Sequence, residues 1–139
     1  MQKAKRAVVF GVFDRLHPGH LAFLAQARAK AGKLMVIIAR DESVTRLKGR
    51  EPREAERMRA AAVRKSGLVS KVFLGDRREG EYRVLQKLAP DLVVLGYDQK
   101  ALAKDIRSRM RAGQFPPMRL FIAKPYLPER WHTRLLTKK

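Results

Sequence analysis

Five short, mostly apolar segments along the chain each predict a buried strand. They cover residues 7–10, 34–39, 69–74, 91–96 and 119–123. The run 34–39 is apolar without interruption. Continuous rather than alternating hydrophobicity indicates a strand covered on both faces, which is typical of a parallel sheet.

The segments between these runs predict four helices, which end at glycines or at an Ala-Pro pair. They are expected to cover residues 18–31, 52–66, 82–88 and 101–112, whereas residues 41–50 are predicted to be a connection. Gly32, Gly67 and Gly113 are the glycines expected to end the first, second and fourth helices. The apolar positions expected to face the core are Leu21, Leu24 and Ala25 in the first helix, Met58, Ala62 and Val63 in the second, Tyr82, Leu85 and Leu88 in the third, and Leu102, Ile106 and Met110 in the fourth.

This alternation of strands and helices predicts an α/β fold. We expect one Rossmann-like, doubly wound domain over residues 1–139, with a five-stranded parallel sheet and helices on both faces. Ligands in such sheets bind beyond the carboxyl ends of the strands, where the strand order reverses. The first strand ends at residues 11–20 and the fourth leads to Asp98. These two loops are therefore expected to meet over one crevice.

Residues 11–20 read Gly-Val-Phe-Asp-Arg-Leu-His-Pro-Gly-His. Pro18 suits the first turn of a helix, so His17 and His20 lie at a helix start, three residues apart, where both rings can face one ligand. Backbone N–H groups and the helix dipole favour phosphate there, and Gly11 and Gly19 permit a sharp turn and a close backbone approach. The alternative is a turn that carries two exposed surface histidines. Because the chain has three histidines and two of them frame this turn, we favour a site.

The charge balance is strongly basic, with 32 Lys and Arg against 13 Asp and Glu, a formal net charge of +19. Such a field attracts polyanions, and it exceeds what one triphosphate substrate needs. A protein that binds RNA or another polyanion without turnover is therefore a rival hypothesis. Basic residues are scattered along the whole chain and aromatic residues make up 7%, which disfavours a dedicated reader of nucleic acid.

Several classes of protein are disfavoured by what the sequence lacks. The chain contains no cysteine, which excludes disulfides, thiolate catalysis and Cys-based zinc sites. It has no bilayer-spanning apolar run and no signal-peptide pattern, so we expect a cytoplasmic protein with no membrane partner. Neither Gly-x-Gly-x-x-Gly nor a Walker-type lysine loop occurs, which disfavours dinucleotide-dependent redox chemistry and P-loop hydrolysis.

The pattern Gly-x-Phe-Asp-x-x-His-x-Gly-His in residues 11–20 resembles the signature of the nucleotidylyltransferase superfamily. That superfamily joins an NTP to a phosphate-bearing acceptor and releases pyrophosphate. Residues 36–44, 47–50 and 95–99 resemble blocks of the archaeal-type FAD synthases, which are FMN adenylyltransferases. The glycerol-3-phosphate cytidylyltransferases, which use CTP, share the histidine motif but are less similar in the later blocks. The resemblance, over about residues 7–133, implies ATP and FMN as substrates, Mg²⁺ as the metal and a homodimer.

The resemblance also implies roles for individual residues. His17 and His20 would stabilise phosphate oxygens in the transition state, and Lys48 would hold acceptor or α-phosphate charge. For Lys48 the alternative is a solvated lysine. For Asp98 the expectation is a ribose contact or magnesium coordination, and the alternative is a helix N-cap. Residues expected against the nucleotide are Gly11, Val12, Phe13, His17, Pro18, Gly19, His20, Gly96, Asp98 and Tyr126, with backbone N–H groups at 12, 13, 19 and 20 around the triphosphate; for Tyr126 the alternative is packing.

Four further residues are candidates for phosphate or acceptor contacts: Asp14, Arg59, Thr133 and Arg134. The alternative for Asp14 is stabilisation of a turn, and for Arg59 an ion pair with the glutamate three residues earlier. The Ser/Thr-rich segment near the family's C-terminus is reduced here to a His-Thr pair followed by Arg134. Val12 stands where relatives usually have Thr, so a hydroxyl contact is lost. These departures bear on the rate and the acceptor rather than on the fold.

Overall fold

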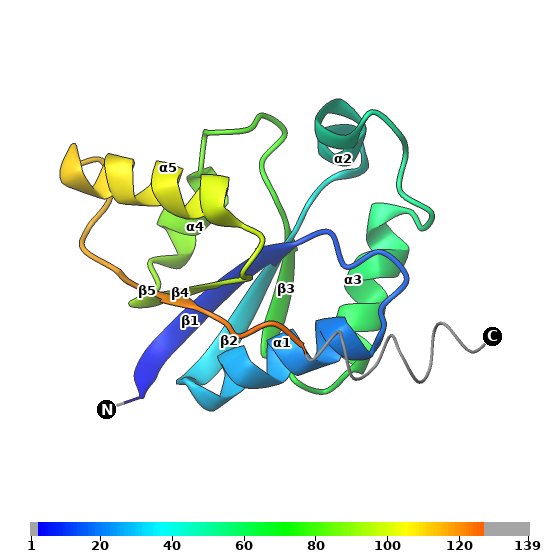
Figure 1. Cartoon of the computed structure of the whole chain (residues 1–139), viewed down its shortest axis with the longest axis horizontal. Coiled ribbons are helices and arrows are strands. Elements are labelled where there is room, and N and C mark those ends of the chain that lie inside the picture. The colour runs from blue at the N-terminus through cyan, green and yellow to red at the C-terminus, as the bar shows by residue number, and fades with distance from the viewer. Residues whose placement is uncertain (1–2, 127–139) are drawn as a thin grey trace.

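The computed structural model describes residues 3–126, and these form a parallel sheet covered by helices on both faces (Figure 1). The sheet has the order β3-β2-β1-β4-β5, and every neighbouring pair is parallel. The strands are β1 (Ala4–Gly11), β2 (Ala31–Ile38), β3 (Lys71–Leu74), β4 (Leu92–Leu95) and β5 (Arg119–Ile122). The helices are α1 (Pro18–Ala29), α2 (Asp41–Lys48), α3 (Glu56–Lys65), α4 (Arg83–Leu88) and α5 (Lys100–Arg111). The predicted fold class is confirmed.

Neighbouring residues of the central strands point to opposite faces, and each face has its own apolar core. Val9 lies in the core beneath α1 and α3, together with Leu24 and Val63. Val8 lies in the other core, beneath α4 and α5, together with Ile106. Two-sided burial explains why these strands are continuous apolar runs in the sequence.

The helix predictions need three corrections. Residues 41–48 form α2 rather than a connection, and Gly49, in the left-handed region at φ 74°, ends it. The helix predicted from 52 begins at Glu56, because the backbone at 53 and 54 is held by Asp14 instead. Gly32 lies within β2, and α1 ends earlier, with the N–H of Lys30 bonded to the carbonyl of Ala27.

Three residues expected in the core are not there. Leu21 and Met58 are 38% and 59% exposed, and Ala25 is also exposed. The buried residues of α1 are Leu24 and Ala27, and those of α3 are Arg59, Ala60 and Val63. Leu24 and Val63 are therefore confirmed as core residues, and the rest of each buried stripe differs from the one predicted. Among residues 3–126, no helix combines the length and apolar character that crossing a bilayer requires.

Candidate active site

The loops after β1 and β4 meet over one cleft of about 1290 Å³ at the carboxyl edge of the sheet, as predicted. The order of the sheet reverses there, because β1 pairs with β2 on one side and with β4 on the other. The cleft is lined by most of residues 10–20, by residues 96–99 and by Tyr126, together with α2 and the loop after β3. The position agrees with the general rule for ligand sites in doubly wound sheets.

His17 and His20 stack on one another at the start of α1, with 3.7 Å between ring centroids and 20° between ring planes. His17 is the N-cap of the helix, and its Nδ1 accepts the N–H of Gly19 at 3.1 Å. The Nδ1 of His20 accepts the N–H of His17 at 3.2 Å, which completes a capping box. An Nδ1 that accepts carries no proton, so this hydrogen-bond pattern places the ring proton of both histidines on Nε2. Each Nε2–H is the donor that remains for a ligand.

His20 is held in its neutral form by its surroundings. Burial is the largest cause that lowers its pKa, and together with the electrostatic effects of His17 and Lys48, against the opposite effect of Asp14, it brings the pKa from 6.5 to about 4. The ring also packs edge-on against Phe13, with centroids 5.4 Å apart. At neutral pH this side chain is therefore an uncharged donor that does not require a proton from solvent.

The loop between β1 and α1 is shaped by the buried ring of Phe13, which is 4% exposed. A Cβ on Gly11 would lie 2.5 Å from Phe13 Cε2, so only glycine fits below this ring. Phe13 and Arg15 both adopt a φ of 51°, in the left-handed region that costs energy for residues other than glycine. The N–H of Arg15 donates to Glu54 Oε1 at 2.8 Å. The surrounding contacts thus hold the loop in one conformation.

Asp14 has the turn-stabilising role that was the alternative at the sequence level. Its carboxylate accepts the N–H groups of Arg53 and Glu54, at 2.8 and 2.9 Å. Burial raises the pKa of Asp14, but these hydrogen bonds and the charges of Arg59 and Arg53 outweigh burial and leave the pKa below its ordinary value. Both carboxylate oxygens are therefore engaged with the chain, which does not support a phosphate or acceptor contact.

Arg59 is a structural brace rather than the predicted phosphate ligand. Its side chain is fully buried and donates to the carbonyls of Val12, Ala39 and Glu54 at 2.8–2.9 Å. It also pairs with Asp41 Oδ1 at 2.6 Å, and not with the glutamate three residues earlier. One guanidinium thus joins the loop after β1, the end of β2, the start of α2 and the segment before α3.

Lys48, Asp98 and Tyr126 lie where the sequence predicted, at the cleft. Lys48 is the last residue of α2, and its positive charge lowers the pKa of His20. Asp98 Oδ1 would lie 2.9 Å from a Cβ on Gly96, which explains the glycine at the end of β4. The N-cap of α5 is residue 99, so the alternative capping role of Asp98 is wrong. Thr133 and Arg134 lie outside the described residues.

Comparison with known proteins places this site in a family. The family model described as cytidylyltransferase-like matches residues 8–116. The chain is 46% identical over 113 residues to the FAD synthase of Methanopyrus kandleri, covering 78% of this chain and 74% of the relative. It is 38% identical over 111 residues to the FAD synthase of Methanosarcina barkeri, covering 80% and 78%. The chain belongs to the archaeal FAD synthase family.

Two solved structures of other proteins have a fold similar to that of this chain. The lipopolysaccharide core biosynthesis protein of Thermoplasma volcanium superposes with a TM-score of 0.79 at 28% identity, covering 88% of this chain and 98% of that one. Pantothenate synthetase of Thermus thermophilus has a TM-score of 0.58 at 20% identity, covering 86% and 55%. The second likeness shows the fold alone.

Gln99 lines the cleft of this FAD synthase family member, but the sequence analysis did not include it among the candidate site residues. Its Oε1 accepts the N–H of Gly96 at 2.8 Å, and its Nε2 donates to the carbonyl of Phe10 at 3.0 Å. It therefore ties the ends of β1 and β4 together across the switch point. The signal was present as an amide side chain directly after Asp98, at the end of a buried strand.

Proposed function

We propose that the chain is an FMN adenylyltransferase, which transfers AMP from ATP to FMN and forms FAD and pyrophosphate. The observation that carries this proposal is the stacked histidine pair, with each Nδ1 bonded to backbone and each Nε2–H left as a donor in the cleft. Membership of the archaeal FAD synthase family supports the choice of substrates.

The reaction requires positioning and charge stabilisation more than covalent help. An oxygen of the FMN phosphate attacks the α-phosphorus of ATP, the bond from that phosphorus to the bridging oxygen breaks in line, and pyrophosphate leaves with the electron pair. His17 and His20 donate Nε2–H to the oxygens on which charge gathers, and Lys48 adds a positive charge. No covalent enzyme intermediate is required.

The nucleotide lies over the start of α1 and the end of β4. Four backbone N–H groups were predicted to surround the triphosphate. That of Gly19 already donates to Nδ1 of His17, so the Nε2–H groups of the two histidines take its place as donors to the phosphates. Asp98 accepts from ribose hydroxyls. Tyr126 lies beside the phosphate loop, since its Cδ2 would be 3.8 Å from a Cβ on Gly19.

Magnesium enters with the triphosphate as part of the substrate. Within the described part of the chain, no group of three or more His, Cys, Asp or Glu side chains is arranged to hold a metal ion. Mg²⁺ commonly keeps several waters and binds through substrate phosphates with one or two carboxylates, so it does not need such a group. Asp98 lines the cleft and would supply a carboxylate ligand, in addition to its contact with the ribose.

A substrate panel tests the proposal. Purified protein with Mg²⁺ is assayed for pyrophosphate release with ATP or CTP, each combined with FMN or glycerol 3-phosphate. We expect release with ATP plus FMN, accompanied by FAD. Release only with CTP plus glycerol 3-phosphate would contradict the proposal and favour a cytidylyltransferase.

A further inference from the structure

The lining of the cleft includes apolar side chains that have no role in the phosphate chemistry described above, and we call them the apolar region. Phe10 and Ile37, at the carboxyl ends of β1 and β2, belong to its lining, and so do the exposed side chains of Leu47 and Tyr97. Leu47 is 70% exposed and Tyr97 52%, whereas the other large exposed apolar side chains among residues 3–126 lie outside this cleft. Exposed apolar side chains that line a pocket are candidates for contact with an apolar part of its ligand.

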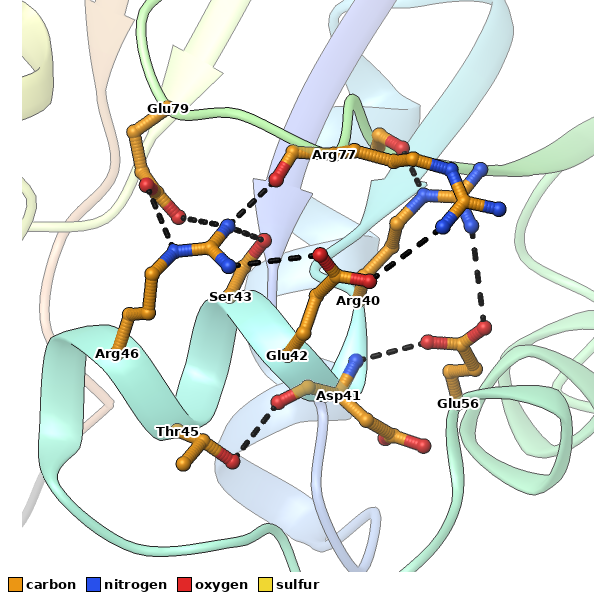
Figure 2. Close-up of polar contacts among 10 residues, drawn as sticks. Arg40, Asp41, Glu42, Ser43, Thr45, Arg46, Glu56, Arg77 and Glu79 are labelled. Atoms are coloured by element: carbon orange, nitrogen blue, oxygen red, sulfur yellow. Dashed lines mark hydrogen bonds and ion pairs between the residues drawn. The ribbon is translucent and has the colours of Figure 1, made fainter.

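Helix α2, which carries Leu47, is joined to the loop after β3 by an ion-pair network (Figure 2). Arg46 pairs with Glu79 at 3.0 Å and with Glu42 at 3.4 Å, and it donates to the carbonyl of Arg77. The Arg77 side chain in turn pairs with Glu42 at 3.5 Å. These contacts join α2, the helix that carries Leu47, to the loop after β3.

The same loop is fastened to α5 on its far side. The hydroxyl of Tyr82 donates to Asp105 Oδ2 at 2.7 Å, and Arg109 Nε donates to the same oxygen at 3.1 Å. Burial and the hydrogen bond to Asp105 raise the pKa of Tyr82 above its ordinary value, so the phenol stays a donor. Figure 1 shows this loop between α2 and α5, and the contacts make the three segments one continuous rim.

We infer that this apolar region binds the isoalloxazine ring of the acceptor, between Leu47 and Tyr97, with Arg46 as a positioning residue for Leu47. The inference rests on the proposed function. A planar tricyclic ring needs a large apolar surface, whereas a small phosphorylated alcohol does not. Lys48 lines the same cleft as Leu47, and its positive charge lowers the pKa of His20, so an FMN whose ring contacts Leu47 can extend its phosphate toward Lys48 and the histidines.

Flavin binding, measured by quenching of flavin fluorescence, tests the inference independently of turnover. Leu47→Ser and Tyr97→Ser are each expected to weaken FMN binding about tenfold, and to weaken riboflavin by the same factor, because the contact is with the ring. Lys48→Met is expected to weaken FMN but not riboflavin, which has no phosphate. Met58→Ser, which changes an apolar residue that is 59% exposed away from the cleft, should change neither.

The outcomes separate this inference from the proposed function. Wild-type Kd values for FMN in both Leu47→Ser and Tyr97→Ser, with FAD still formed by the unaltered protein, would overturn the ring site and leave the proposed function standing. Ring-dependent losses of flavin binding in a protein that forms no FAD would support the ring site and overturn the proposed function.

Discussion

The two regions of the cleft are built by different means. Around the histidines, the contacts are with backbone or are buried: His17 and His20 cap α1, and the fully buried Arg59 holds three carbonyls. Around Leu47, the contacts are ion pairs between side chains that are each more than 40% exposed, such as Arg46 with Glu79. The first kind of construction fixes atoms closely, and the second is weaker and is screened by salt.

The difference matches what each region has to do. Transition-state stabilisation at the α-phosphorus depends on donors held at one place before the reaction starts. Binding of a large planar acceptor requires only that the apolar side chains that contact it lie in roughly the right position. Exposed ion pairs that hold α2 are therefore adequate for binding the acceptor, whereas the same kind of contact would not position the histidines closely enough for catalysis.

The largest expected effect is on catalysis at the histidines. Asn is a good N-cap, so His17→Asn keeps an acceptor for the Gly19 N–H while removing the Nε2 donor. We expect kcat for FAD formation to fall by about 10²–10⁴-fold, with the thermal unfolding midpoint close to that of the wild type. Steady-state kinetics and a thermal melt measure both. A wild-type kcat would contradict the role of this ring.

A large effect on stability is expected from Arg59→Met. The variant leaves the carbonyls of Val12, Ala39 and Glu54 and the carboxylate of Asp41 without this donor. Urea unfolding should show a loss of about 3 kcal/mol in the free energy of unfolding. The matched control is the exposed arginine two positions earlier on the same helix: Arg57→Met should stay within about 0.5 kcal/mol of the wild type. Equal losses in the two variants would show that Arg59 is no brace.

A pH-dependent loss of stability is expected at His20. Its pKa is 6.5 unfolded and about 4 folded, so between these values the unfolded chain binds a proton that the folded chain does not. The free energy of unfolding therefore falls as the pH is lowered from 6.5 to 4. Thermal melts over this range should show a shallower fall for His20→Asn than for the wild type. Identical slopes would mean that His20 titrates normally in the folded protein.

The smallest expected effect comes from the exposed network of α2. Arg46→Met should lower the free energy of unfolding by less than about 1 kcal/mol, because exposed ion pairs contribute little. It should raise the KM for FMN several-fold while leaving the KM for ATP in place. Arg107→Met, an exposed arginine on α5 outside the cleft, serves as the control. Equal changes in both KM values would show that Arg46 does not act on the acceptor side alone.

The region around the histidines could be predicted from the sequence because its determinants are local. Gly11, Pro18 and the spacing of the two histidines specify a strand end and a helix cap within ten residues. Buried strands are equally local signals, since two-sided burial appears directly as a continuous apolar run. The cleft followed from the topology of the sheet.

The rest depended on contacts between distant segments. The role of Arg59 comes from carbonyls contributed by three separate parts of the chain, and nothing near Arg59 in the sequence indicates them. Helix α2 was missed because only Ser43 and Val44 are buried in it, so it shows no apolar stripe. Met58 was misplaced because the helix turns Arg59 to the interior instead.

The most direct test is a single-turnover measurement of FAD formation with ATP, FMN and Mg²⁺ at saturating concentrations, for the wild type and for His20→Asn. FAD should form with the wild type, and the variant should form it at least about 10²-fold more slowly while still binding both substrates. Two results would contradict the proposed function or its mechanism: no FAD from the wild type, or equal rates for the two proteins.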